Sequence, residues 1–360
     1  MKKLDSMPAR HPVNATLELT LRCNLKCKMC MFRHADNENA RLASEELSAS
    51  RWADLARQMF DAGTLNILIT GGEPLLREDF REIYSSIYRL GFVVTLYTNA
   101  TLVTEEIMQT LRQYPPHKIG ITLYGASNET YEKLCGCADG FDRAIAGVRA
   151  LATLPSALEF RTTLVQDNYK DLSTLEALVK QEFDKTISHS AAVFQSVRGG
   201  CMSASECRLT PEQSVDLTVH RTLDRIRQLL TPEQRQHIRL YIADPQPECS
   251  NKAAGFSLLG CNAGMYDVTV TYDGKLLGCQ MLGIFRTDAV NLGFAEAWEQ
   301  WPYSVRLPQL NGECAACSNI DSCAICPAVR MAECGDLAGR PDYICQRTKL
   351  LANMKGESLL

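Results

Sequence analysis

Residues 65–97 read LNILITGGEPLLREDFREIYSSIYRLGFVVTLY, and this stretch indicates the fold class. Leu65 to Thr70 is an apolar run with the length of a buried strand, and Phe92 to Tyr97 is a second one. Between them lie a glycine turn and a helical pattern that ends at Gly91. Two buried strands joined by one helix predict a parallel pair with a right-handed crossover.

The same alternation continues on both sides of this stretch. Further strands are expected at residues 13–19, 119–124, 158–165 and 186–194, and helices at 49–62, 141–154, 172–183 and after the capping residue Thr104. Six strand–helix units are fewer than the eight of a complete TIM barrel, so we expect an α/β fold with a partial (β/α)6 barrel. On this pattern alone, a doubly wound open sheet is the alternative.

The charge balance excludes some classes of partner. The chain has 360 residues and a formal net charge of −4, with 38 Lys and Arg against 42 Asp and Glu. A nucleic-acid-binding protein usually carries a strongly basic surface, so we expect no nucleic-acid partner. The sequence has no signal peptide and no apolar run of the roughly 18 residues that span a bilayer. We therefore expect a cytoplasmic protein without a membrane partner.

Cysteine is the residue out of proportion, at 16 positions. Reducing compartments do not keep disulfides, so cysteines in such a chain more often bind metal or react. Nine of them fall between Cys249 and Cys345, in a stretch poor in aliphatic residues, and metal binding can supply the folding energy that this stretch lacks. We expect an N-terminal extension at 1–12, the partial barrel at 13–240 and a cysteine-rich domain at 241–360.

Three cysteines with the spacing Cys23-x3-Cys27-x2-Cys30 directly follow the first predicted strand. Parallel α/β folds place their sites at this end of a strand. Three thiolates are one fewer than a closed zinc site requires, whereas a four-iron, four-sulfur cluster on three cysteines keeps one iron open for a ligand. A zinc site completed by a distant histidine is the alternative, although the six histidines show no metal-binding spacing.

The turn Gly71-Gly72-Glu73-Pro74 ends the next strand. Its two glycines let the backbone approach a ligand closely, and the carboxylate of Glu73 can hold an ammonium group. Alone, such a tetrapeptide is commonly a simple turn. At the matching strand end one unit after the cysteine trio, it indicates a second part of the same site.

The cysteine trio and this turn together resemble the radical S-adenosylmethionine (SAM) superfamily. The resemblance implies that the three cysteines hold a [4Fe-4S] cluster whose open iron binds SAM, while Gly71, Gly72, Glu73 and Pro74 bind the SAM amino group. Reductive cleavage then yields a 5′-deoxyadenosyl radical that abstracts a hydrogen atom from the substrate.

Two weaker matches and one departure accompany this resemblance. Thr98-Asn99 resembles the family's TNG turn, with Ala100 in place of glycine, and Thr122 stands where relatives often have a serine near the SAM ribose. The family usually has an aromatic residue before the third cysteine, whereas this chain has Met29.

The C-terminal cysteines follow the pattern Cys261-x12-Gly274-x4-Cys279, then Cys314-x2-Cys317-x5-Cys323-x2-Cys326, then Cys345. This resembles the SPASM extension of radical SAM enzymes, with one residue fewer before Cys326 than the family has. The resemblance implies two auxiliary [4Fe-4S] clusters, three clusters in all. The first would be held by Cys249, Cys261, Cys279 and Cys326, and the second by Cys314, Cys317, Cys323 and Cys345. Two zinc ribbons are the alternative.

Five cysteines remain without a role, and the sequence does not assign one to Cys135, Cys137, Cys201, Cys207 or Cys334. A free cysteine is often a small buried apolar residue. For Cys135 and Cys137, at a predicted helix end, we favour that interpretation.

SPASM enzymes mostly modify peptides, so the resemblance implies a ribosomally made precursor peptide or protein as substrate and a thioether, carbon–carbon or related crosslink as product. It also implies an electron donor such as flavodoxin or ferredoxin. Only 12 residues precede the first predicted strand, so any leader peptide is expected to bind the barrel, the C-terminal domain or a separate leader-binding protein.

Three other functions stay open. A sulfatase-type maturase, which forms formylglycine, needs a carboxylate base, for which Asp267 and Asp273 are candidates. A haem-pathway enzyme needs a large apolar pocket. A non-catalytic iron–sulfur scaffold is the least favoured, because it would have no need for Glu73.

Overall fold

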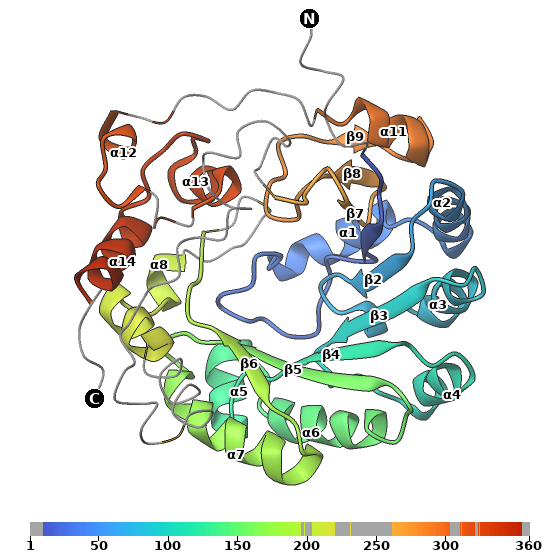
Figure 1. The fold of residues 1–360 in the computed structure, drawn as a ribbon. Helices are drawn as coiled ribbons and strands as arrows, with labels where there is room; N and C mark the ends of the chain where they lie inside the picture. The colour runs from blue at the N-terminus through green and yellow to red at the C-terminus, as the bar shows by residue number, and fades with distance from the viewer. Residues whose placement is uncertain are drawn as a thin grey trace, which may run out of the picture.

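The structure is a computed structural model that describes residues 10–195, 198, 204–219, 231, 261–302, 310, 312–320, 323 and 325–354. Six parallel strands joined by helices form most of the first half (Figure 1). The strands are β1 (Asn14–Glu18), β2 (Asn66–Thr70), β3 (Val93–Thr98), β4 (Lys118–Thr122), β5 (Ala157–Thr163) and β6 (Ile187–Ser190). All six strands predicted from the sequence are confirmed within a few residues.

The strands lie in the order β6-β5-β4-β3-β2-β1, so each crossover moves one strand in the same direction. The helices therefore lie on one face of the curved sheet, as Figure 1 shows. They are α2 (Ala49–Asp61), α3 (Phe80–Tyr88), α4 (Glu105–Gln113), α5 (Asn128–Cys135), α6 (Gly140–Leu151) and α7 (Leu172–Phe183). A doubly wound sheet would reverse direction and cover both faces. This arrangement confirms the partial barrel.

Local signals set the ends of these helices. The hydroxyl of Ser48 accepts a hydrogen bond from the backbone N–H of Arg51 at the start of α2, and Thr104 does the same for Ile107 at the start of α4. The helix expected directly after the glycine turn begins later, at Phe80. Its place is taken by a short 3-10 turn, Pro74–Leu76, which Glu73 caps.

The main core lies between the sheet and the outer helices. Alternate strand residues such as Leu17, Ile69 and Leu96 point to the helices and are fully buried, and Trp52 and Tyr84 pack against them from α2 and α3. The other face of the strands carries polar residues such as Glu18 and Thr122, which leaves a polar interior for a site.

The C-terminal region extends the same sheet. A hairpin is formed by β7 (Asp267–Val270) and β8 (Lys275–Leu277), with Gly274 at φ +79° in its turn, and β9 (Thr287–Asp288) follows. β7 pairs in parallel with β1, a long-range pairing that the sequence does not predict. The remaining helices are α1 (Asn39–Glu45), α8 (Ala204–Cys207), α11 (Phe294–Gln300), α12 (Gly312–Ala315), α13 (Pro327–Cys334) and α14 (Asp342–Asn353).

Trp301 is the apolar centre of the first part of this region. It is 1% exposed, and its ring lies so close to Gly264 and Gly278 that a side chain at either position would stand within 2.2 Å of it. Residues 211–219 are helical, as expected from the sequence, while the predicted domain boundary after residue 240 lies outside the described residues. Of the helices in the described ranges, none has the length and apolar composition to cross a membrane.

Candidate active site

The cysteine trio lies on the loop that leaves the carboxyl end of β1. The loop is fastened to the end of α5, because the N–H of Lys26 donates to the carbonyl of Cys135 at 2.7 Å and the N–H of Lys28 donates to the carbonyl of Leu134 at 3.1 Å. Lys28 and Lys133 both pair with Asp167, at 2.7 and 2.9 Å. The loop is therefore held by α5 as well as by its own strand.

The glycine turn packs directly against the same loop. The N–H of Gly72 donates to the carbonyl of Thr20 at 2.7 Å, and the N–H of Glu73 donates to the carbonyl of Arg22 at 2.9 Å. A Cβ atom would stand 2.3 Å from the Thr20 oxygen at Gly71 and 2.2 Å from the Arg22 oxygen at Gly72. Both positions therefore require glycine for the turn to meet the loop.

Glu73 joins this turn to the end of β3. Its carboxylate accepts hydrogen bonds from the N–H of Leu75 at 3.1 Å, the hydroxyl of Thr98 at 2.8 Å and the N–H of Asn99 at 2.8 Å. The side chain is 1% exposed, and burial raises its pKa to about 7 in spite of these three donors. A buried carboxylate of this kind is suited to receive a cation.

The turn after β3 brings an amide to the first cysteine. The Nδ2 atom of Asn99 lies 3.8 Å from the sulfur of Cys23 and 3.0 Å from the side-chain oxygen of Asn24. Ala100 has φ +61°, the left-handed conformation that glycine adopts most easily. This backbone agrees with a turn in which glycine is the usual residue and alanine a tolerated replacement.

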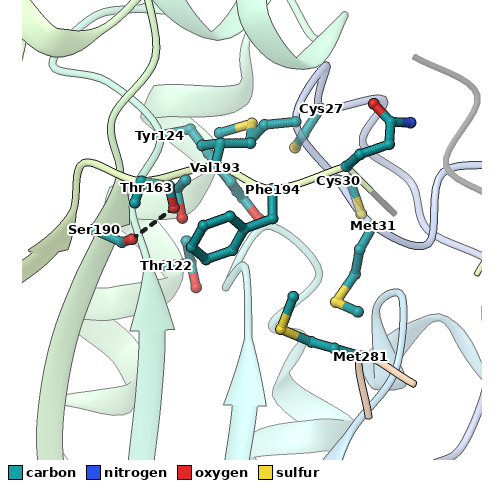
Figure 2. A pocket seen from close by; sticks show the side chains of 13 residues that line it. Cys27, Cys30, Met31, Thr122, Tyr124, Thr163, Ser190, Val193, Phe194 and Met281 are labelled. Carbon is teal, nitrogen blue, oxygen red and sulfur yellow. Dashed lines mark hydrogen bonds between the residues drawn. The ribbon is translucent and has the colours of Figure 1, made fainter. Parts of the chain in front are cut away.

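A cavity of about 310 Å³ opens beside the cysteines (Figure 2). Cys27 and Cys30 line one side of it, with Met29 and Met31 between and beside them. The hydroxyl residues Thr122, Thr163 and Ser190 line it from the carboxyl ends of β4, β5 and β6, and apolar side chains complete the wall, among them Val193, Phe194 and Met281. The site predicted at the strand ends therefore has room for a ligand.

The three thiols have different surroundings. Cys23 and Cys30 each receive a backbone N–H at 3.4 Å, from Leu25 and Phe32. The sulfur of Cys27 lies 3.5 Å from that of Cys135, and this hydrogen bond together with burial raises the pKa of Cys27 well above its usual range. Metal binding to Cys27 must therefore displace a firmly held proton.

A model of the radical SAM superfamily matches residues 17–177, which run from β1 into α7 and contain the cysteine trio and the glycine turn. This part of the chain is a radical SAM domain. A domain of this superfamily implies SAM and a [4Fe-4S] cluster as cofactors.

Two curated relatives align with this radical SAM chain over most of its length. The AdoMet-dependent heme synthase of Methanosarcina barkeri is 25% identical over 92% of this chain and 95% of its own. The mycofactocin maturase MftC of Mycolicibacterium smegmatis is 26% identical over 87% of this chain and 77% of its own. Both relatives are enzymes, and the radical SAM chain is an enzyme as well.

Solved structures extend the likeness beyond the barrel. Streptococcus suis SuiB bound to S-adenosylmethionine superposes with a TM-score of 0.67, at 19% identity over 94% of this chain and 78% of that one. SuiB has also been solved with its precursor peptide SuiA. At this identity the likeness shows the fold alone, and it covers the cysteine-rich C-terminal region as well as the radical SAM domain.

The C-terminal cysteines of the radical SAM chain lie in two neighbourhoods. Cys279 directly follows β8, and its pKa is raised to about 11 by burial first and then by the nearby thiols of Cys326 and Cys261. Burial likewise raises the pKa of Cys323, and the thiols of Cys345 and Cys314 near it raise it further. The two ligand sets stay predictions, and Cys249 lies outside the described residues.

A buried arginine accompanies the second group. Arg330 is 2% exposed, and its Nη1 atom donates to the sulfur of Cys314 at 3.4 Å and to the carbonyl of Gly339 at 2.7 Å. The exposed guanidinium of Arg340 pairs with Glu313, and the nearby thiol of Cys345 also raises its pKa. A buried cation such as Arg330 requires a nearby negative charge, so it fits thiolates that hold an anionic cluster.

In the part of the chain that the structure describes, no three Cys, His, Asp or Glu side chains are gathered closely enough to chelate a single ion.

The other candidate residues lie away from the cavity or have no assigned role. Asp267 accepts a hydrogen bond from Asn14 at 2.7 Å, and Asp273 accepts one from Thr271 in the hairpin turn at 2.5 Å. Neither is among the residues that line the cavity. Of the five cysteines without a role, Cys135 and Cys207 are buried, Cys137 is half-buried, Cys334 is exposed and Cys201 lies outside the described residues.

The sequence reasoning missed one buried network at the site. Arg198 binds Glu18, the last residue of β1, through both guanidinium nitrogens at 2.6 and 2.7 Å, and Gln280 donates to the same carboxylate at 2.9 Å. Gln280 follows Cys279, so the network joins the barrel interior to the first C-terminal cysteine group. A glutamate at the end of an apolar strand was the only sequence signal for it.

Proposed function

We propose that the chain is a radical SAM/SPASM enzyme that cleaves SAM reductively and modifies a peptide substrate, with a thioether or carbon–carbon crosslink as the product. The observation that carries the SAM-cleaving part is the buried carboxylate of Glu73. It lies in a glycine turn whose backbone is bonded to the cysteine loop, which places a cation-binding group close to Cys23, while Cys27 and Cys30 on the same loop line the cavity.

Each residue of the site has a role in this proposal. Cys23, Cys27 and Cys30 hold the cluster, Gly71, Gly72 and Pro74 shape the turn, and Glu73 binds the SAM ammonium group. Asn99 orients the first cysteine through its amide, and Thr122 offers a hydroxyl to the SAM ribose. When bound, the cluster and SAM supply the 5′-deoxyadenosyl radical that abstracts a substrate hydrogen atom. The closely packed turn excludes water from the Glu73 carboxylate.

Two auxiliary clusters complete the proposal. Cys261, Cys279 and Cys326, with Cys249, hold the first, and Cys314, Cys317, Cys323 and Cys345 hold the second. Because these eight cysteines would supply every ligand, bound clusters would provide electron transfer rather than a binding site for the substrate. The guanidinium of Arg330 beside Cys314 supports an anionic group at the second site.

The cavity supports a peptide side chain as substrate. The described residues that line it include no Asp, Glu, Lys or Arg. A carboxylate-bearing macrocycle would need cations to pair with, and formylglycine formation would need a carboxylate base, so the lining favours neither. The maturases among the relatives, and a fold neighbour solved with its precursor peptide, point to the same substrate class.

A haem-pathway reaction is the second candidate. It is favoured by one observation, the relative named as a heme synthase, which aligns over 92% of this chain and 95% of its own length. Either reaction takes place in a reducing cytoplasm with an electron donor such as flavodoxin or ferredoxin. A peptide substrate would carry a leader sequence. A separate protein that binds this leader is then a further partner.

Anaerobic reconstitution with iron and sulfide, followed by SAM and dithionite, tests the chemistry. We expect 5′-deoxyadenosine from the wild-type protein and from Cys137→Ala, and none from Cys27→Ala. No product from a wild-type protein with full iron content would contradict the proposal. Incubation with short peptides encoded beside the gene, and separately with an iron porphyrin, then identifies the substrate class by the mass of the product.

A further inference from the structure

We propose that Cys135 is a positioning residue of the catalytic cluster, which donates an S–H hydrogen bond to the sulfur of Cys27 and so sets the reduction potential of the cluster. The proposal rests on the function proposed above, in which Cys27 is a cluster ligand. It gives a role to a cysteine that lies 108 positions away in the sequence and outside both cysteine motifs.

The two sulfurs are close together and are largely shielded from solvent. Their separation is 3.5 Å, Cys135 is fully buried and Cys27 is 5% exposed. A thiolate bound to iron carries no proton, so in the loaded enzyme only Cys135 can donate. Since Cys135 is fully buried, no solvent molecule competes for the Cys27 sulfur on the side that faces Cys135.

The backbone fixes this approach. Lys26 and Lys28 flank Cys27, and their N–H groups donate to the carbonyls of Cys135 and Leu134 at the end of α5. The helix stops there because Gly136 adopts the left-handed conformation, with φ +65°. Cys27 is therefore bracketed by two backbone hydrogen bonds to the segment that carries Cys135.

Other donors are recorded beside the other two ligands. Cys23 and Cys30 each receive a backbone N–H, and Cys23 has the amide of Asn99 at 3.8 Å, the far end of hydrogen-bond range. Cys27 instead has two side-chain groups beside its sulfur, the thiol of Cys135 and the hydroxyl of Tyr124. The chain thus places buried donors on one corner of the cluster.

The electrostatic consequence has a definite sign. A hydrogen bond to a ligand sulfur withdraws negative charge from the cluster and stabilises its reduced form, so it raises the reduction potential. Loss of the bond leaves the cluster harder to reduce. The effect is greatest with a weak biological reductant and smallest with dithionite in excess.

The test is a redox titration of the reconstituted full-length protein followed by electron paramagnetic resonance. Cys135→Ala is expected to lower the midpoint potential of the SAM-binding cluster, with iron content unchanged. Cys135→Ser keeps a donor at the same position and is expected to restore most of the shift. Cys137→Ala, two residues along, and Cys207→Ala, which is also buried, are matched controls expected to leave the potential at the wild-type value.

Different failures are distinguishable in this experiment. A wild-type protein that binds no cluster or yields no 5′-deoxyadenosine overturns the proposed function. An active wild type whose potential equals that of Cys135→Ala overturns the role of Cys135. Equal shifts for the alanine and serine variants, or iron lost from Cys135→Ala alone, also overturn it, since these would indicate packing or direct ligation.

Discussion

The barrel and the cysteine-rich C-terminal region share one sheet but are stabilised by different means. The strands β1 to β6 have four to seven residues each and are covered by helices of up to 13 residues over a continuous aliphatic core. In the C-terminal region, β8 and β9 have three and two residues, and α12 has four. Its interior includes Trp301 and the buried guanidinium of Arg330.

This difference indicates which interactions stabilise each half. The barrel builds the SAM site from backbone contacts that need no metal, such as those of Gly72 and Glu73 with the cysteine loop. The C-terminal helices α13 and α14 share only a small apolar cluster, which includes Val329, Tyr343 and Ile344, and under the function proposed above the auxiliary clusters would stabilise this region as well. The predictions that follow test this difference.

Removal of iron is expected to have the largest effect, and to destabilise only the C-terminal region. Chelation of the reconstituted protein should expose residues 312–354 to limited proteolysis and to fast amide hydrogen exchange, because the clusters that hold them are gone. The barrel strands should keep their protection. Loss of protection in both halves at the same chelator concentration would show that the barrel depends on metal too.

A glycine substitution in each half gives the next largest contrast. Gly72→Ala should destabilise the barrel by about 3 kcal/mol, because the new methyl group meets the backbone oxygen of Arg22. Gly312→Ala, with no atom within 4 Å of the added Cβ, should change stability by less than about 0.5 kcal/mol. Urea unfolding of the metal-free proteins measures both. Equal stabilities for the two variants would refute the tight contact.

The smallest effect is the change in the stability of the barrel with pH. Burial raises the pKa of Glu73 to about 7, so between about pH 4.5 and pH 7 the folded protein holds a proton that the unfolded chain has lost. Stability of the metal-free barrel should therefore fall by about 2.5 kcal/mol as the pH rises through this window, and should change little above it.

Glu73→Gln should remove this fall, and Glu106→Gln, on the exposed side of α4, should keep it. Urea midpoints at pH 5 and pH 8 provide the comparison for the three proteins. A wild-type barrel that becomes more stable over the same window would mean that the three hydrogen bonds to Glu73 outweigh its burial.

Much of the barrel could be predicted from the sequence, because its signals are local. Apolar runs of strand length, the capping residue Thr104 and the spacing of the cysteine trio each lie within a few residues. The glycine turn was also identifiable, but its contacts with Thr20 and Arg22 come from tertiary packing.

The features that escaped prediction are long-range. The pairing of β7 with β1 and the network of Glu18, Arg198 and Gln280 join residues far apart in the chain, and no local pattern marks either. Cys135 matched the expectation of a buried cysteine, yet its distance from Cys27 depends on how α5 docks on the loop. Sequence spacing carries no information about that docking.

The position of β1 between β2 and β7 has a consequence for synthesis on the ribosome. Asn14 pairs with Asp267, which is added 253 residues later. Until then, the strand that leads into the catalytic cysteines has an unpaired edge, which is open to incorrect pairing. The first strand to be translated is therefore the last strand of the barrel to gain both of its neighbours, and only from then on does the nascent chain present the cysteine loop on a finished sheet.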